Sequence, residues 1–251
     1  MISVFLIGGG WRAETFPQTY GRFLKAATRD GGGDERRIAI VVAEEPDADS
    51  HAQYLRFLSA FEAVGLNSAE EAFEIIVSAA NPLTGEKLSK ISPTGVFVCG
   101  GLTPAYADAL CVDCSWLEYL IENRIPYGGF SAGASIASDR AIVGGWRSEI
   151  NGRIVEVANE NAGEDLDLLD VRAGLGLVAF AIDVHATQWG TLSRLIHAVD
   201  ARLVERGWAI DENTMLEIIE DEGKIRGAGN AYLVRRQNRD GKITVDVFQS
   251  E

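Results

Sequence analysis

A serine flanked by glycines near the middle of the chain is the strongest candidate for chemistry. Ser131 lies in the segment Gly129-Phe130-Ser131-Ala132-Gly133, between a short apolar stretch and a predicted helix. Small residues on both sides allow a tight strand-to-helix turn, which lifts the hydroxyl out of the sheet and directs the amides of the helix N-terminus at its target. Alternatively, the serine only caps the helix. Ser131 is therefore a candidate nucleophile that needs partners elsewhere in the chain.

A serine nucleophile needs a base that accepts its proton, and histidine is the usual base near neutral pH. The chain has three histidines. His51 lies at the start of a predicted helix and His197 lies inside an amphipathic helix, so we expect both to be structural. His185 follows the apolar run Ala181–Val184 at the end of a predicted strand. We expect His185 to be the base because it would reach the same crevice as Ser131.

An acidic side chain must then fix the imidazole tautomer and stabilise the imidazolium. Glu149, shortly after the predicted helix that follows the serine, is our choice for this role. Asp183 and Asp170 are the alternatives. Asp183 and His185 would share one face of an extended strand, but this arrangement alone does not give the required contact.

The oxyanion hole should consist of two backbone N–H groups. We expect one from Ala132, directly after the nucleophile, and one from Gly101, at the end of a neighbouring predicted strand. Glycine at position 101 would let a carbonyl oxygen approach the backbone closely.

Apolar runs alternate with helical patterns through the first half of the chain. Predicted strands cover 2–7, 37–43, 74–78, 95–99 and the residues leading to Ser131, and predicted helices cover 20–28, 47–64 and 104–122. This alternation predicts an α/β fold with a mostly parallel sheet and helices on both faces. In such sheets the chemistry lies beyond the carboxyl ends of the strands. Three glycine-rich loops fall at predicted carboxyl ends, at 8–10, 100–101 and 128–133.

The pattern loosens after the serine. The acidic stretch 152–172 is expected to be a surface excursion, with a mobile lid as one interpretation. A predicted strand over 177–184 and a helix over 190–206 follow. Strands over 208–212 and 215–220, and antiparallel pairs up to residue 248, are expected to close the end of the sheet. No linker or repeat divides the chain, so we predict one α/β domain over residues 1–251.

Composition and charge exclude several classes of protein. The formal net charge of −14 argues against general binding to nucleic acid or to an anionic membrane. No apolar run reaches the ~20 residues that span a bilayer, and residues 2–7 are expected to form a strand and not a signal peptide.

The three cysteines, Cys99, Cys111 and Cys114, indicate reduced thiols and a cytoplasmic location. The Cys111-x-x-Cys114 segment looks helical and lacks the further ligands that zinc needs, so we expect no metal and no cofactor.

These motifs, in this order, resemble peptidase family S51, which includes cyanophycinase and the aspartyl dipeptidase peptidase E. The similar segments span roughly residues 2 to 235 and include 99–101, 129–134, 174–177, 182–185 and 206–214. The resemblance implies a class I glutamine amidotransferase-like fold, a flavodoxin-like three-layer sandwich, with serine in place of the amidotransferase cysteine. It also implies the site roles of Ser131, His185, Glu149, Gly101 and Ala132.

Departures from the family bear on specificity. Leu102, next to Thr103, stands where the family usually has asparagine. Trp189 and Thr191 replace two arginines of cyanophycinase-like members, whereas Arg194 remains. Because arginines at those positions could clamp a substrate carboxylate, their loss argues against strict aspartyl specificity. We expect Leu102, Thr103, Trp189 and Arg194 to bind substrate, although Arg194 would fit a helix surface equally well.

The leading hypothesis is a serine peptidase that cleaves a peptide or isopeptide bond of a small or exposed peptide through an acyl-enzyme. One alternative is an esterase of α/β-hydrolase type, because the Gly-x-Ser-x-Gly motif and the serine–acid–histidine order also fit that fold. The other is a non-catalytic binding module on an amidotransferase-like scaffold. The expected partner is a small peptide, neither nucleic acid nor membrane, and a homodimer is compatible with the sequence.

Overall fold

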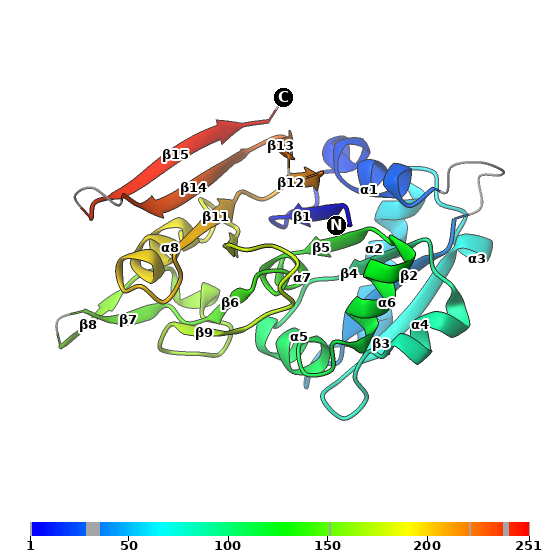
Figure 1. Ribbon diagram of the computed structural model, residues 1–251, viewed down its shortest axis with the longest axis horizontal. Helices are drawn as coiled ribbons and strands as arrows, with labels where there is room; N and C mark the ends of the chain where they lie inside the picture. The colour runs from blue at the N-terminus through cyan, green and yellow to red at the C-terminus, as the bar shows by residue number, and fades with distance from the viewer. Residues whose placement is uncertain (1, 29–35, 151, 221, 238–240, 251) are drawn as a thin grey trace.

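A seven-stranded sheet forms the centre of the computed structural model, which describes residues 2–28, 36–150, 152–220, 222–237 and 241–250 (Figure 1). Its strand order is β13-β12-β1-β5-β4-β2-β3. The parallel strands are β1 (Val4–Ile7), β5 (Tyr127–Phe130), β4 (Gly95–Val98), β2 (Ile38–Ala43) and β3 (Ala72–Val77). Antiparallel β12 (Thr214–Ile219) and β13 (Glu222–Gly227) complete one edge. The predicted α/β fold with a mostly parallel sheet and antiparallel C-terminal strands is confirmed.

Helices cover both faces of this sheet. Phe97 of β4 packs against aromatic side chains of α1 (Tyr20–Ala26) and α2 (Ser50–Glu62), including Phe23 and Phe61. On the neighbouring strand, Tyr127 pairs in register with Val96 and packs instead against Trp116 of α6 (Ser115–Asn123). Successive side chains of a strand point to opposite faces, so these two aromatic groups lie in separate layers of the core. Near-continuous apolar strands are the pattern expected when both faces are buried.

The remaining helices of the N-terminal half are short. They are η1 (Ala13–Gln18), α3 (Ser68–Glu71), α4 (Gly85–Ile91), α5 (Thr103–Leu110) and α7 (Ala132–Ser135). Within the described residues, none of the helices combines the length and the apolar character needed to cross a bilayer.

The prediction of a single helix over 104–122 is wrong, because α5 and α6 are separate helices. The chain turns at Cys111 and Cys114, which were expected to be helical. Asp113 Oδ1 accepts a hydrogen bond from Ser115 N at 2.9 Å, which competes with helix continuation and starts α6 afresh. Cys111 is partly buried and Cys114 is exposed.

A second sheet lies beside the first, in the order β10-β11-β14-β15 (Figure 1). Its strands are β10 (Ala181–Val184), β11 (Arg206–Ile210), β14 (Asn230–Arg236) and β15 (Ile243–Gln249), and α8 (Thr191–Asp200) packs on it. The last antiparallel strands were expected to close the end of the main sheet, but β14 pairs with β11 instead. The chain passes from β11 in the second sheet to β12 in the first, and returns from β13 in the first sheet to β14 in the second, so two short connections join the sheets.

The segment between the serine and the histidine contains two small antiparallel strand pairs. β6 (Arg140–Gly144) pairs with β9 (Asp170–Ala173), and β7 (Arg147–Ile150) pairs with β8 (Arg153–Glu156). The short helix η2 (Glu160–Ala162) lies between β8 and β9. The acidic stretch expected to be a surface excursion therefore includes β8, η2 and part of β9.

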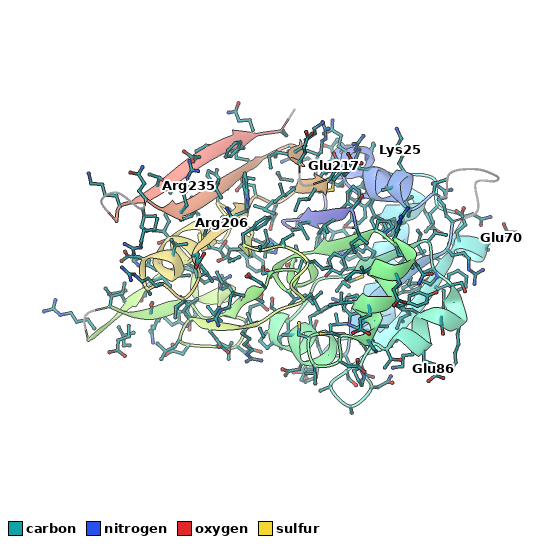
Figure 2. All side chains as sticks on the ribbon, in the orientation of Figure 1. Lys25, Glu70, Glu86, Arg206, Glu217 and Arg235 are labelled. Atoms are coloured by element: carbon teal, nitrogen blue, oxygen red, sulfur yellow. The ribbon has the colours of Figure 1, made fainter. Side chains whose placement is uncertain are left out.

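Charged side chains lie mainly outside this core, as Lys25, Glu70 and Glu86 do (Figure 2). Glu217 of β12 is an exception, because it is buried. It accepts hydrogen bonds from Arg22 of α1 at 2.6 Å and from Arg226 of β13 at 3.0 Å. This buried carboxylate therefore ties the antiparallel edge of the sheet to the first helix.

Candidate active site

Ser131 occupies the sharp turn from β5 into α7. Its φ of +51° and ψ of −110° are strained for a residue with a side chain, as is common at functional turns. Glycine is required on both sides. A Cβ at Gly129 would lie 2.4 Å from the Gly133 carbonyl oxygen, and one at Gly133 would lie 2.3 Å from the Val98 oxygen. The expected tight strand-to-helix turn is therefore present, and its hydroxyl opens into a cavity.

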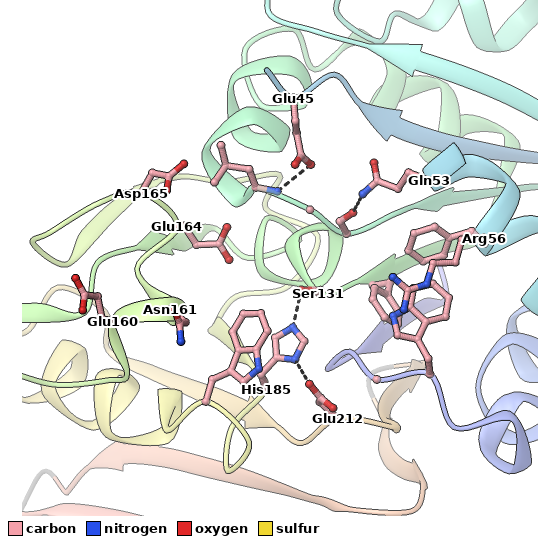
Figure 3. Close-up of a pocket in the computed structure, with 18 residues that line it drawn as sticks. Glu45, Gln53, Arg56, Ser131, Glu160, Asn161, Glu164, Asp165, His185 and Glu212 are labelled. Atoms are coloured by element: carbon pink, nitrogen blue, oxygen red, sulfur yellow. Dashed lines mark hydrogen bonds and ion pairs between the residues drawn. The ribbon is translucent and has the colours of Figure 1, made fainter. Parts of the chain in front are cut away.

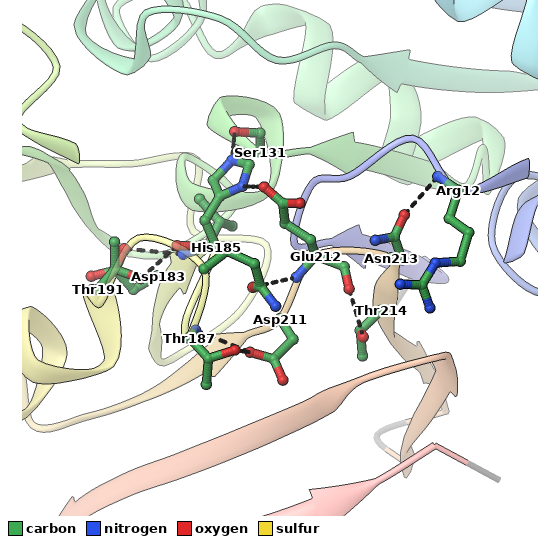
Figure 4. A network of polar contacts seen from close by, with 12 residues as sticks. Arg12, Ser131, Asp183, His185, Thr187, Thr191, Asp211, Glu212, Asn213 and Thr214 are labelled. Atoms are coloured by element: carbon green, nitrogen blue, oxygen red, sulfur yellow. Dashed lines mark hydrogen bonds and ion pairs between the residues drawn. The ribbon is translucent and has the colours of Figure 1, made fainter. Parts of the chain in front are cut away.

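His185 follows directly after β10 and reaches the serine. Its Nε2 lies 2.9 Å from Ser131 Oγ (Figures 3 and 4). The backbone of His185 also has positive φ, +55°, and its N–H donates to the Gly8 carbonyl at 2.9 Å. The structure thus brings together the two side chains that the sequence offered as nucleophile and base.

Glu212 completes the polar chain. Its Oε1 lies 2.8 Å from His185 Nδ1, the ring nitrogen that does not face the serine. Glu212 lies in the turn between β11 and β12, and its N–H donates to Gln188 Oε1 at 3.0 Å. A carboxylate on Nδ1 holds the proton there and leaves Nε2 free to accept the serine proton.

A buried neighbour fixes the turn that carries this carboxylate. Asp211 accepts hydrogen bonds from Thr187 N at 3.0 Å and from Thr187 Oγ1 at 2.7 Å (Figure 4). It also accepts one from Asn230 N at 3.0 Å. Thr187 belongs to the loop after His185, so Asp211 clamps the two loops of the polar chain together.

The carboxylate expected at the histidine is elsewhere in the structure. Glu149 is exposed on β7. Asp170, one alternative, accepts a hydrogen bond from Arg172 at 2.8 Å on β9. Glu212 stands at His185 instead, which corrects the sequence-based choice. The sequence did contain a signal for Glu212. This residue lies at the carboxyl end of the predicted strand 208–212, just as His185 lies at the carboxyl end of a predicted strand.

Asp183, the other alternative, is committed to a buried ion pair. Its two oxygens accept hydrogen bonds from Arg194 Nε at 2.9 Å and Nη2 at 2.7 Å, and the two residues are 1% and 4% exposed. Arg194 also donates to the carbonyls of Gly145 and Ala162. Arg194 was expected to bind substrate, but the structure places it in the interior, where it joins α8 to the segment around η2.

Burial sets the protonation state of the histidine. Removal from water lowers the pKa of His185 below its ordinary value, and the Glu212 carboxylate opposes this effect without cancelling it. His185 is therefore neutral near pH 7, which is the form that can accept a proton from Ser131.

The amides of Gly101 and Ala132 are available as donors. Ala132 is the first residue of α7, so its N–H has no acceptor within the helix. Within the described residues, neither amide donates to a protein acceptor. The loop that carries Gly101 packs on the serine, since a Cβ at Gly100 would lie 2.9 Å from Ser131 Cβ.

The site opens into a cavity of about 800 Å³ at the carboxyl ends of the parallel strands (Figure 3). One side of Ser131 is apolar and carries a cation. There Arg56 lies over the Trp11 ring, 3.9 Å from its centroid. The other side is acidic. The cavity-lining carboxylates are Glu45, Glu160, Glu164, Asp165 and Glu212. Leu102 and Trp189, two of the expected substrate-binding residues, also line this cavity.

Glu164 and Glu45 are held by the loop that follows β4. Thr103 N donates to Glu164 Oε2 at 2.9 Å, and Leu102 N donates to Glu45 Oε1 at 2.9 Å. Thr103, expected to bind substrate, thus positions a cavity carboxylate. Burial raises the pKa of Glu164 to about 7. The sequence did not identify either glutamate as a cavity residue. Acidic residues in loops are usually solvated, and no pattern distinguished these two from the others.

The segment 157–165 forms the acidic wall of the cavity, through Glu160, Asn161, Glu164 and Asp165 (Figure 3). This places part of the predicted lid region beside Ser131. Among the described residues, no group of three or more His, Cys, Asp or Glu side chains is arranged to hold a metal ion.

Comparison with known proteins gives two cyanophycinases among the sequence relatives. No family model matches the chain. The cyanophycinases of Synechococcus elongatus and Thermosynechococcus vestitus are each 26% identical to it over 230 residues, or 89% of this chain. The chain spans 65% of the length of these relatives.

The fold also has a solved counterpart. A peptidase from an acI-B1 Actinobacterium superposes with a TM-score of 0.65 at 15% identity, covering 100% of this chain and 95% of that one. At this identity the structural match shows the fold. The sequence similarity to the two cyanophycinases agrees with the resemblance to peptidase family S51.

Proposed function

We propose that this chain, a relative of the cyanophycinases in a peptidase S51-like family, is a serine peptidase acting on a small or exposed peptide. One observation carries the proposal. Ser131 Oγ, the His185 ring and Glu212 Oε1 form an unbroken polar chain with steps of 2.9 and 2.8 Å. This series of polar contacts ends at the Ser131 hydroxyl, which faces a cavity large enough for a short peptide.

Acylation would begin at Ser131. Its Oγ attacks the scissile carbonyl carbon while His185 Nε2 takes the hydroxyl proton, and the carbonyl electron pair moves onto oxygen. The amides of Gly101 and Ala132 would donate to this oxyanion. The Glu212 carboxylate stabilises the imidazolium that forms.

The tetrahedral intermediate then collapses. The C–N bond breaks, His185 gives its proton to the leaving amine, and an ester to Ser131 remains. Water attacks this ester with His185 again as base, which releases the acid and restores the serine hydroxyl. Peptide and isopeptide bonds follow the same steps, because the leaving group is an amine in both.

The charges of the cavity favour a substrate with a positive group. Five carboxylates line it, and Arg56 is the cation among the described lining residues. A neutral indole, Trp189, stands where the resemblance suggested a carboxylate-binding arginine. An acidic side chain would meet repulsion in this cavity, so strict aspartyl specificity is not expected.

A panel of dipeptides and isopeptides with cationic, neutral and acidic residues tests the proposal, with p-nitrophenyl esters alongside. Ser131→Ala should abolish hydrolysis, whereas Ser135→Ala, a buried serine of the same helix, should retain it. We expect cationic peptides to be cleaved faster than acidic ones. Peptide hydrolysis that survives in Ser131→Ala would contradict the proposal. Hydrolysis of the esters together with no hydrolysis of any peptide in the panel would favour the esterase alternative.

A further inference from the structure

Trp189 lies flat against the histidine of the site. The ring centroids of Trp189 and His185 are 3.9 Å apart, and the ring planes differ by 8°. The backbone produces this stack, because Trp189 N donates to the His185 carbonyl at 2.9 Å and closes one turn of chain. The indole is 37% exposed and lines the cavity, so it covers one face of the imidazole and meets the space for substrate with its remaining surface.

The other sides of the imidazole are also occupied. Nε2 and Nδ1 face Ser131 and Glu212. The backbone at Gly9 closes a further side, since a Cβ there would lie 2.2 Å from His185 Cε1. Because the His185 backbone itself is strained, at a φ of +55°, the ring position depends on these surroundings. Trp189 supplies the ring-stacking part of them.

We propose that Trp189 is a positioning residue, which holds the His185 ring in the orientation that joins Ser131 to Glu212 and keeps water from one face of it. Its effect on hydrolysis rests on the proposed function, whereas the stack and its response to protonation do not. This role differs from that of the arginine suggested by the resemblance, because a neutral indole stacks on the imidazole and forms no ion pair with a carboxylate.

Three charged groups around His185 affect its pKa besides burial. They are Glu212 from the β11–β12 turn, Asp183 from β10 and Arg194 from α8. Asp183 and Arg194 offset each other as an ion pair. Glu212 raises the pKa of His185, and burial, to which the Trp189 indole contributes, lowers it by more. Removing the indole should admit water and raise that pKa toward its ordinary value.

Intrinsic fluorescence tests the stack without any substrate. A protonated imidazole quenches an indole in contact with it, so His185 should report its own titration through Trp189. We expect the wild type to lose fluorescence on acidification with a midpoint below pH 6.5. This transition should vanish in Trp189→Phe and in His185→Gln, and persist in Trp208→Phe, a control at a tryptophan that does not line the cavity and packs on Phe248 in the second sheet. A transition that survives in Trp189→Phe, or none in the wild type, would overturn the inference.

Kinetics on a cleaved peptide supply the second readout. Trp189→Ala should lower kcat by about tenfold with little change in KM, because ring orientation matters in the transition state. It should also move the acid limb of the kcat profile to higher pH. Trp189→Phe, which can still stack, should recover most of kcat. An unchanged acid limb in Trp189→Ala would refute the positioning role even if kcat fell. A wild type without peptidase activity would refute the proposed function alone, and the fluorescence result would still decide the stack.

Discussion

Replacing Glu164 by glutamine should make the protein more stable at high pH. Glu164 faces the cavity with one oxygen held by Thr103 N at 2.9 Å, and its pKa is raised to about 7, chiefly by burial. Arg194 lies near enough to lower that pKa in part, but it is already paired with Asp183. Glutamine keeps an acceptor oxygen for Thr103 and removes the charge, so the substitution isolates the cost of ionising this carboxyl.

The size and sign follow from linkage. The pKa in the folded protein, about 7, is above the ordinary 4.5, so the folded state binds the proton more tightly than the unfolded state. The stability from the protonated carboxyl is fully present below pH 4.5 and is lost as pH rises through 7. At a pH above both pKa values, this pKa difference lowers the free energy of unfolding by about 3 kcal/mol. The advantage of Glu164→Gln over wild type should therefore grow by about 2–3 kcal/mol from about pH 5 to about pH 8.

Urea unfolding of both proteins at half-unit steps across that range measures the difference. Asp165→Asn is the control, because Asp165 is the exposed neighbour on the same wall and should show a nearly constant difference from wild type. If the free energies of unfolding of Glu164→Gln and wild type run parallel with pH, Glu164 is not a buried, proton-binding carboxyl and the reasoning fails.

Three further outcomes can be measured on single variants or on the wild type. Gly101→Ala should lower kcat by up to about 100-fold, because its Cβ would lie 1.8 Å from Glu45 Oε1 and displace the carboxylate that accepts from Leu102 N, beside the proposed oxyanion donor; wild-type kcat would contradict this. Arg194→Met should cost about 3–5 kcal/mol in urea unfolding, because it leaves Asp183 buried and unpaired, and a loss under about 1 kcal/mol would argue against that pairing. The acid limb of wild-type kcat/KM should have its midpoint below pH 6.5, since burial lowers the pKa of His185, and a higher midpoint would disagree.

Much of the fold was predictable because burial leaves a strong mark on sequence. The strands β1, β2 and β4 are buried along their whole length, and their unbroken apolar runs could be recognised directly. The site followed from them, since glycine-rich loops and His185 fall at carboxyl ends of strands. The division of α5 from α6 was missed because it depends on the local Asp113–Ser115 hydrogen bond, which does not interrupt the apolar periodicity.

The acid partner of the histidine was harder to predict. Glu212 reaches His185 because the chain leaves the second sheet after β11 and joins the first at β12, a crossing that apolar periodicity does not reveal. The choice of Glu149 relied on order along the chain, whereas the contact depends on which sheet each strand joins. The Arg194–Asp183 ion pair could not be predicted either, because the sequence does not distinguish an arginine on the surface of a helix from a buried one. The single-domain interpretation stays a prediction.

The rate at which a fluorophosphonate labels Ser131 tests the central claim most directly. Peptide mapping by mass spectrometry locates the adduct, and wild type is compared with Glu212→Gln and Glu149→Gln. We predict an adduct on Ser131, formed at the wild-type rate in Glu149→Gln and at least about 100-fold more slowly in Glu212→Gln. Equal labelling of the two variants, or an adduct on another residue, would contradict a Ser131–His185–Glu212 site.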